Sequence, residues 1–417
     1  MITLSLICFT GFITLSSGSK CCSPPQWERT EYITGTEVVS GKMSPIQGEA
    51  RTSYDENNGK IVSEYTITRG QKKTTEHVLM DYPGKMKYSV SGGVCKKSTL
   101  TGPFTKACIP DNATPPLPMY FGIGDHKINV TNYVVVSPGR ISSLLVSDNC
   151  VPFSNTTVSK QGETPFVLSF GYNGTTIGIK DSSVFNIPPA CQQENADKVT
   201  DRERPMFMTK LFGMREQIRD KPKPRAAPKC CIPKQFQSPG GMIGLVEVNG
   251  KAMQQGTSMT ISYDAMLEKV ATTSQTSIDG YPPTTEVQLK DYKAKIQYTL
   301  RNGVCQKIPL NSFPDPCMPD DATYKPMVLG SGANTLKGGI YSYVYEGINM
   351  TLFMTEDCIP ISEMLNGDVG PNVEYWYSLG YSAISLGIKD PSVFNVPAAC
   401  KGAAMDVSHE EPFVSIR

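Results

Sequence analysis

Twelve of the thirteen cysteines fall into two sets of six that repeat 208 to 210 residues apart. The first set is Cys21, Cys22, Cys95, Cys108, Cys150 and Cys191, and the second is Cys230, Cys231, Cys305, Cys317, Cys358 and Cys400. Thiols can form disulfides or bind a metal ion. Zinc sites gather their ligands at short spacings, but this chain has no CxxC pair and only three histidines. The pattern therefore predicts a tandem duplication of one disulfide-bonded module.

The spacing of the cysteines limits which of them can pair. The Cα atoms of adjacent residues lie about 3.8 Å apart, which is below the usual minimum of about 4.4 Å for a disulfide. Cys21 and Cys22 should therefore bond to distant partners, as should Cys230 and Cys231. Six cysteines still allow many connectivities, and their spacing alone does not choose among them.

The two repeats share no recognisable set of catalytic residues. His77, His126 and His409 stand at unrelated positions of the two repeats, whereas a catalytic histidine that was duplicated with its domain should recur. The GxSxG, HExxH and P-loop patterns are also missing. We therefore expect the protein not to be an enzyme.

Two pairs of acidic residues could offer oxygens to calcium, the cofactor that we consider. They are Asp320–Asp321 and Glu356–Asp357. Neither pair belongs to an EF-hand loop, and the alternative is that both are simply solvated.

The N-terminus indicates export. Residues 1–19 form an apolar stretch that ends in small residues, which is typical of a signal peptide. Its removal would also remove Cys8 and leave an even number of cysteines, as expected for a secreted, oxidised protein. No other stretch approaches the roughly 20 apolar residues of a membrane span, and a net charge of +1 gives no reason to expect nucleic acid. Five glycosylation sequons agree with export, at Asn112, Asn129, Asn155, Asn173 and Asn349.

The elements that must position these residues read as β-strands. Apolar and polar side chains alternate over 85–90 and at the matching segment 294–300, and a similar pattern covers 61–68. Turn signals such as Asn58–Gly59 and Asn302–Gly303 separate such runs. Strands with one apolar face and short turns predict antiparallel sheets.

The repeats set the domain boundaries at 20–191 and 230–400, with a tail at 401–417. The linker, 192–229, is charged and contains apolar residues at helical spacing, followed by a proline-rich spacer. We expect an amphipathic helix near 205–220 whose apolar face is Phe207, Leu211, Met214 and Ile218.

The best-kept motif precedes the last cysteine of each repeat. It reads IGIKDSSVF at 177–185 and LGIKDPSVF at 386–394, so Lys180, Asp181 and Phe185 recur as Lys389, Asp390 and Phe394. The Lys–Asp pair could hold a ligand, or the Asp could close a turn by bonding to the following backbone. With CSPPQW at 22–27, GVC at 93–95 and DNCVP at 148–152, the motif resembles the ependymin and ependymin-related family over both repeats. Ser182 stands where the family tends to have proline.

The resemblance implies a fold and a set of disulfides. Family members resemble bacterial lipoprotein carriers, with a strongly curved antiparallel sheet around a deep apolar pocket, so we expect a mostly β chain with one such pocket per domain. The implied bridges are Cys95–Cys191 and Cys305–Cys400, with Cys150 bonded to Cys21 or Cys22, Cys358 bonded to Cys230 or Cys231, and Cys108 and Cys317 taking the cysteines that remain.

The resemblance also implies function and assembly. Family members are secreted glycoproteins, some of them lysosomal, that are associated with hydrophobic ligands, calcium, cell–matrix adhesion and homodimers. We therefore expect a carrier of lipid-like ligands, with a calcium-dependent adhesion glycoprotein as the alternative and the lysosomal lumen as a second compartment. Because two copies are tethered on one chain, we expect them to pack as an intramolecular pseudo-dimer rather than as two independent beads.

Overall fold

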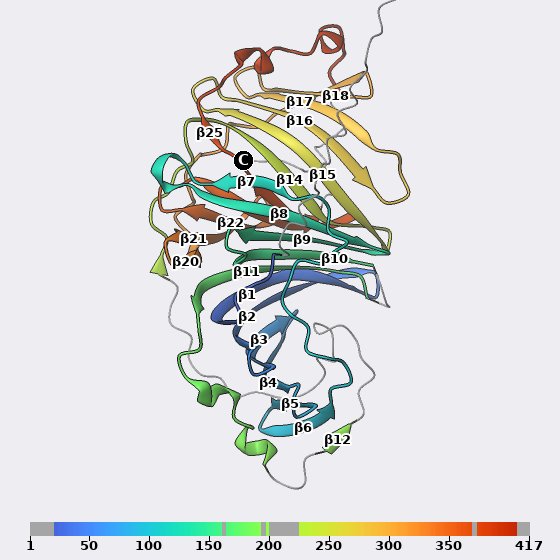
Figure 1. The fold of residues 1–417 in the computed structure, drawn as a ribbon. Coiled ribbons are helices and arrows are strands. Elements are labelled where there is room, and N and C mark those ends of the chain that lie inside the picture. Colours follow the sequence, from blue (N-terminus) through green and yellow to red (C-terminus); the bar gives the residue numbers. More distant parts are fainter. Residues whose placement is uncertain (1–20, 161–163, 193–196, 200–224, 369–372, 407–417) are drawn as a thin grey trace, which may run out of the picture.

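The computed structural model describes residues 21–160, 164–192, 197–199, 225–368 and 373–406, and these residues form mostly β-structure (Figure 1). The strands of the first repeat are β1 Gln26–Val39, β2 Lys42–Asp55, β3 Lys60–Arg69, β4 Lys72–Asp81, β5 Met86–Ser91, β6 Val94–Thr99, β7 Leu117–Phe121, β8 Ile128–Ser137, β9 Arg140–Ser147, β10 Pro152–Ser159 and β11 Phe166–Ile177. The linker adds β12 Asp197–Val199 and β13 Arg225–Ala226.

The second repeat forms the same series of strands. They are β14 Gln235–Val248, β15 Lys251–Asp264, β16 Lys269–Ile278, β17 Thr284–Asp291, β18 Ile296–Arg301, β19 Val304–Pro309, β20 Thr323–Ser331, β21 Asn334–Tyr345, β22 Ile348–Thr355, β23 Pro360–Asp368, β24 Val373–Tyr381 and β25 Ser385–Leu386. The helices of the described chain are short 3-10 turns: η1 Gly124–His126, η2 Ser182–Phe185, η3 Pro189–Cys191, η4 Pro391–Phe394 and η5 Ala398–Cys400.

Each repeat builds one large sheet from two meanders. In the first repeat, β1 to β6 follow one another and β7 to β11 form a second run, and the two runs join where β1 pairs with β11. The second repeat joins β14 to β24 in the same way. The strand pairs are antiparallel, apart from β12, which lies parallel to β6. The expected tandem antiparallel sheets are therefore confirmed.

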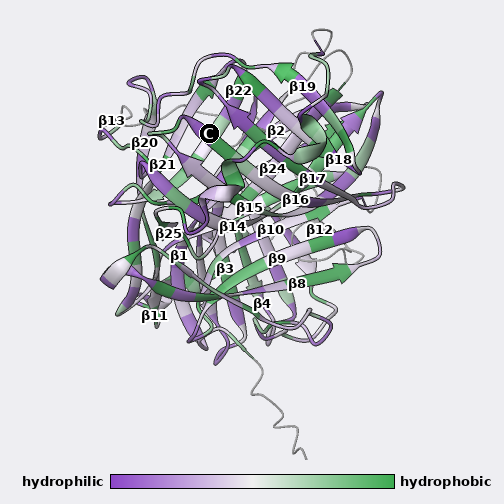
Figure 2. Cartoon of the chain, turned by 90° about the horizontal axis from the view of Figure 1, so that it is seen from above, coloured by the Kyte–Doolittle hydropathy of each residue, from purple (hydrophilic) through white to green (hydrophobic). Residues whose placement is uncertain are grey.

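The strands lie where apolar and polar residues alternate, because successive side chains of a strand point to opposite faces of the sheet. The three expected segments become β3, β5 and β18, each within two residues of its predicted ends. Apolar and hydrophilic colours follow one another along the strands of both sheets in Figure 2.

Each repeat contains three disulfides. They are Cys21–Cys150, Cys22–Cys108, Cys95–Cys191, Cys230–Cys358, Cys231–Cys317 and Cys305–Cys400. No bridge of this set joins the two repeats. The first of two adjacent cysteines bonds to the cysteine of the DNCVP-type segment, which resolves the choice that the sequence left open.

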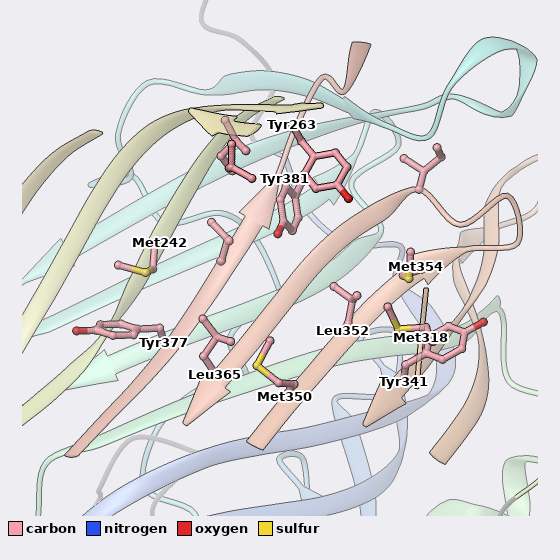
Figure 3. Packing of buried hydrophobic residues seen from close by; sticks show 14 of the residues in the cluster. Met242, Tyr263, Met318, Tyr341, Met350, Leu352, Met354, Leu365, Tyr377 and Tyr381 are labelled. Carbon is pink, nitrogen blue, oxygen red and sulfur yellow. The ribbon is translucent and has the colours of Figure 1, made fainter. Parts of the chain in front are cut away.

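Large flexible and aromatic side chains fill one face of the second sheet. Met242 and Tyr377 from neighbouring strands lie there with Tyr263, Met350 and Leu365, and all five are buried (Figure 3). Methionine adapts to irregular gaps in a core. This face is therefore packed by side chains.

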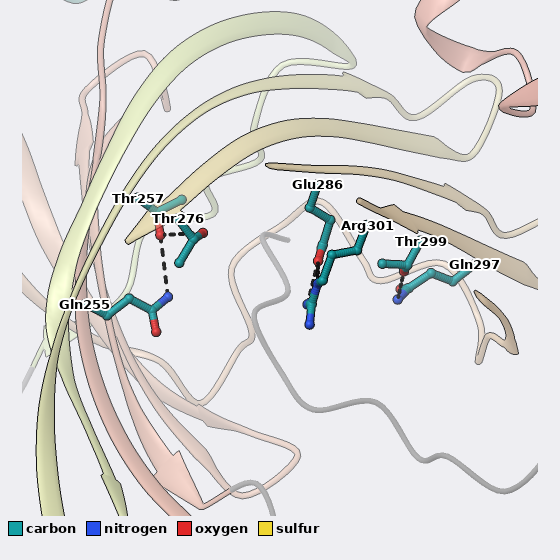
Figure 4. A network of polar contacts seen from close by, with 7 residues as sticks. All are labelled: Gln255, Thr257, Thr276, Glu286, Gln297, Thr299 and Arg301. Carbon is teal, nitrogen blue, oxygen red and sulfur yellow. Dashed lines mark hydrogen bonds and ion pairs between the residues drawn. The ribbon is translucent and has the colours of Figure 1, made fainter. Parts of the chain in front are cut away.

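The outer arm of the second sheet carries polar contacts instead. Thr257 bonds to Thr276 at 3.0 Å, and Gln255 donates to Thr257 at 3.4 Å (Figure 4). Further along the arm, Arg301 and Glu286 form an exposed ion pair at 2.5 Å. The cross-strand pairs among these contacts, Thr257 with Thr276 and Glu286 with Arg301, each stabilise the arm by roughly 0.2–1 kcal/mol.

The two repeats share buried apolar residues. One cluster, which we call the inter-repeat core, contains Phe121, Ile128, Val130 and Phe153 of the first repeat with Met327, Leu329, Leu336, Phe353 and Ile361 of the second. A second cluster joins Val158 and Val167 to Leu245 and Trp376. In Figure 1, β8, β10 and β11 accordingly lie near β20 and β21 of the second repeat, which they contact.

Several expected features lie outside the described residues. These are the signal peptide with Cys8, the linker helix near 205–220 with its apolar face, and His409. The tail is described to Asp406, which accepts a hydrogen bond from Gln306 at 3.1 Å.

Candidate ligand-binding cavity

A cavity of about 1230 Å³ lies between the two repeats. Its walls come from β1 to β4 and β7 to β11 of the first sheet and from β14, β15 and β20 to β24 of the second. We expected a pocket within each repeat, but this large cavity is shared by both. The physical reason is that tyrosine and methionine side chains fill the interior face of the second sheet, whereas many side chains that face the other repeat are small.

An apolar belt forms part of the cavity wall. It consists of Met119, Phe121, Leu145 and Phe153 from the first repeat and of Met327, Leu329, Ile340, Phe353 and Ile361 from the second. These residues belong to the inter-repeat core or pack against it. A cavity that two sheets enclose through such side chains presents mostly carbon and sulfur to its contents.

The first repeat supplies a charged corner of the cavity. Lys325, which projects from the second repeat, pairs its Nζ with Glu49 Oε2 at 2.7 Å. The same Nζ lies 3.6 Å from the ring centroid of Tyr32. All three residues line the cavity, so an ion pair and a cation–π contact join the repeats across this corner.

The second repeat supplies a corner of small residues. Gly240, Gly241, Gly256 and Gly380 line the wall, together with Ser258, Ser378 and Ser382. A Cβ atom placed on Gly256 would meet no atom within 4 Å. This corner is therefore wide and uncharged.

One tyrosine of the wall is held in its protonated form. Tyr381 is buried and donates its hydroxyl to Glu363 Oε2 at 2.9 Å. Burial, with the nearby Glu363 carboxylate as a second cause, raises the pKa of Tyr381 well above its ordinary value. The phenol therefore stays neutral and acts as a fixed donor rather than as an acid or base.

The duplicated motif lies away from the cavity. Asp181 accepts from the Ser183 backbone N–H at 2.9 Å, and Asp390 does the same with Ser392. These hydrogen bonds hold the pKa of each carboxyl below its usual range. The structure thus has the turn that the sequence offered as one alternative, with Lys180 and Lys389 exposed beside it.

The phenylalanine of the motif supports the last disulfide. Phe185 packs with Cys95 and Cys191, and Phe394 packs beside Cys400 in the second repeat. Both rings are buried. The motif therefore serves the core of each repeat.

The sequons lie in different surroundings. Asn112, Asn129 and Asn349 are exposed, and Asn155 is half-buried. Asn173 is half-buried at the boundary between the repeats, where it donates to the Tyr32 hydroxyl at 3.2 Å and accepts from the Val328 N–H at 2.7 Å. A glycan on Asn173 would conflict with both contacts.

Metal-ligand residues do not gather in the described part of the chain. No group of three or more His, Cys, Asp or Glu residues there could hold an ion. The acids at 320–321 and 356–357 are exposed, His77 is half-buried on β4 and His126 is exposed. Among the described residues, no helix has the length and apolar character that a membrane span needs.

Sequence reasoning missed the residues that shape the cavity. A comparison of the two repeats could have found them, because the strand registers make Tyr32, Glu49 and Lys325 equivalent to Gly241, Ser258 and Leu117 of the other repeat. A charged and aromatic set is thus replaced by a small and apolar one at the equivalent place.

Comparison with known proteins identifies the family. The ependymin family model matches residues 70–191 and 283–400. Ependymin-related protein 1 of Haliotis asinina is 27% identical over 195 residues, which cover 44% of this chain and 96% of that protein. Mammalian ependymin-related protein 1 of Rattus norvegicus is 26% identical over 188 residues, which cover 43% of this chain and 80% of that protein. Each of these relatives therefore has about the length of one repeat.

Among solved structures, a DUF1329 family protein from Desulfovibrio piger matches 39% of this chain and 90% of its own, at 8% identity and a TM-score of 0.20. A likeness at that TM-score carries no argument.

The family match covers both repeats and more than half of the residues, in agreement with the duplicated cysteines and the motif before the last of them. The chain belongs to the ependymin family.

Proposed function

We propose that this protein is a non-enzymatic carrier that binds one lipid-like molecule in the cavity shared by its two repeats. The observation that carries the proposal is the size of the cavity together with its apolar belt. Pockets for drug-sized ligands measure roughly 300–1,000 Å³. A volume of about 1230 Å³ suits a larger molecule with one or more acyl chains.

The chemistry of the wall favours an apolar ligand over a sugar or a nucleotide. Burial of each methylene of an acyl chain contributes about 0.8 kcal/mol, and the belt offers sulfur and aromatic surfaces for such contacts. Charged side chains come from one part of the wall, where Arg51, Glu64 and Lys73 accompany the pair of Lys325 and Glu49, and the apolar belt supplies the apolar contacts.

We further propose that the repeats form an intramolecular pseudo-dimer. Gly41 and Gly250 occupy the same turn in the two repeats, and a Cβ atom on Gly41 would lie 3.2 Å from the Cα of Gly250. Equivalent residues that meet their own counterparts are expected on a two-fold axis. Both have positive φ values, 73° and 82°, which only glycine adopts easily.

Export and glycosylation belong to the same proposal. Six disulfides agree with an oxidising compartment, the extracellular space or the lysosomal lumen. The alternative, a calcium-binding glycoprotein of cell–matrix adhesion, has no gathered acidic site among the described residues to favour it. Self-association of the purified protein that appears with calcium and disappears with a chelator would support that alternative.

The carrier function is tested by native mass spectrometry and by titration with 11-(dansylamino)undecanoic acid, a fluorescent fatty acid. We expect co-purified lipid, and after its removal we expect one probe molecule per chain. Two molecules per chain would indicate separate pockets within the repeats. The absence of binding would contradict the carrier function.

A cavity-filling variant makes the test specific. Gly256→Trp places an indole in open space on the cavity wall, so it should weaken binding of the probe about tenfold, or about 1.4 kcal/mol. The matched control is Val304→Trp, because Val304 is 74% exposed on β19 and is not part of the wall. The control should bind as the unmodified protein does.

A further inference from the structure

We propose that ligands enter and leave the shared cavity at the corner formed by the second repeat, while the equivalent corner of the first repeat is sealed. This inference rests on the proposed carrier function and deepens it. It follows from a difference between two places that the duplication made equivalent. We call them the sealed corner, at Tyr32, Glu49 and Lys325, and the open corner, at Gly241, Ser258 and Leu117.

The sealed corner is held by contacts between the repeats. Lys325 pairs with Glu49 at 2.7 Å, with both side chains 45% exposed, and its Nζ lies 3.6 Å from the centre of the Tyr32 ring. Behind it, Met327 is 4% exposed. A Cβ atom on Gly171 would lie 3.0 Å from Met327 Cε. The first sheet and β20 of the second repeat therefore close on one another here.

The open corner lacks the ion pair, the cation–π contact and the packed methionine, although β7 still meets the second repeat where the Ala383 N–H donates to the Tyr120 carbonyl oxygen at 3.1 Å. Gly241 pairs across the sheet with Gly380 on β24 and with Ser258 on β15. In the same way, Tyr32 pairs with Gly171 on β11 and with Glu49 on β2. A Cβ atom on Gly380 would meet only the carbonyl oxygen of Gly241, at 3.9 Å. No described atom of the first repeat comes within 4 Å of that point.

The strand that should cover the open corner is also more exposed. Leu117 stands where Lys325 stands in the other repeat, and 58% of its surface is exposed. Met119 is half-buried, although its counterpart Met327 is buried. Gly241 and Ser258 are exposed and line the cavity. The open corner is thus an uncharged opening with an apolar residue at its rim.

This asymmetry has a consequence for exchange of the ligand. An acyl chain that left through the sealed corner would have to break an ion pair and displace a packed methionine. The open corner requires neither step. Exchange should therefore pass through the open corner, and its rate should depend on the residues there.

The test transfers the sealing residues to the open corner. The triple variant Leu117→Lys, Gly241→Tyr and Ser258→Glu rebuilds the native set. A tyrosine at 241 has room, because a Cβ atom there would meet only the Thr257 carbonyl oxygen, at 3.9 Å. Stopped-flow fluorescence with 11-(dansylamino)undecanoic acid measures association and dissociation of the probe. We expect both rates to fall about tenfold while the dissociation constant changes less than threefold.

Two further variants keep the test decisive. A control variant with the same number of substitutions but no ion pair combines Leu117→Lys, Gly241→Ala and Ser258→Lys. This control should exchange the probe nearly as fast as the unmodified protein. The double variant Glu49→Ser and Lys325→Leu removes the seal from the first repeat and should speed dissociation at least threefold. It does not depend on whether the triple variant folds.

The outcomes separate this inference from the carrier function. Unchanged exchange rates in the triple variant, or in the double variant if the triple variant does not fold, would overturn the assigned path while the unmodified protein still bound the probe. An unmodified protein that did not bind the probe would instead contradict the carrier function itself.

Discussion

Truncation of one buried phenylalanine in the first repeat should lower the stability of the second repeat. Phe153 is 1% exposed, and of the nine buried members of the inter-repeat core, five belong to the second repeat. Its ring faces Gly330, since a Cβ atom there would lie 3.1 Å from Phe153 Cε1. Truncation of a buried phenylalanine to alanine costs about 3–5 kcal/mol.

The magnitude sets the expected signal in hydrogen exchange. If the second repeat bears about 3 kcal/mol of that loss, the amides of β20 to β22 should lose roughly a hundredfold in protection, because each 1.4 kcal/mol is a factor of ten. Hydrogen exchange with mass spectrometry, on peptides from 323–345 and 348–355 of the Phe153→Ala variant, measures this directly.

The matched control removes a side chain that is equally buried within one repeat. Leu79 is 0% exposed and packs in a cluster that belongs wholly to the first repeat. Leu79→Ala should cost about 2–5 kcal/mol and should leave exchange in β20 to β22 unchanged. If Phe153→Ala changed hydrogen exchange only in the first repeat, as the Leu79→Ala control should, the result would refute the inter-repeat core and the proposed pseudo-dimer.

Three further predictions concern other parts of the molecule. Peptide mapping should find a glycan on exposed Asn349 but not on Asn173, whose amide contacts Tyr32 and Val328; an occupied Asn173 would contradict that geometry. Burial raises the pKa of Tyr263 to about 12, and the unfolded phenol ionises near 10, so stability should fall between these pH values. Tyr263→Phe should reduce this loss of stability at high pH and change stability little at pH 7, since the Tyr263 hydroxyl bonds to no described residue. A variant with the same dependence of stability on pH would argue against the raised pKa of Tyr263. In urea unfolding, Gly35→Ala should cost about 1–3 kcal/mol, because its Cβ would lie 2.0 Å from a carbonyl oxygen, whereas Gly256→Ala should be neutral or stabilising.

Much of the fold was predictable because its determinants are local or repeated. Alternation of side chains predicted the strands at 61–68, 85–90 and 294–300, since the period of a strand is two residues. The duplicated cysteines predicted two modules, because the same sequence forms the same contacts twice. The turn at Asp181 also needed only the neighbouring Ser183.

The cavity was less predictable because its residues come from many strands. Tyr32, Glu49 and Lys325 are remote in sequence, and each alone is an ordinary surface residue. Their contact depends on how the first sheet meets β20, which no local pattern encodes. The expected pocket in each repeat was misplaced for the same reason, because side-chain volume on both faces decides where space remains.

The sequence by itself determined the duplication, the strands, the turns and the family, through patterns of period two, shared spacing and local hydrogen bonds. Tertiary structure alone decided which adjacent cysteine bonds to which partner, where the large cavity lies and which of its corners is closed. Those outcomes depend on contacts between segments that are remote in sequence, as in the pair of Lys325 and Glu49, which are 276 residues apart. Such contacts form only when two complete sheets are brought together.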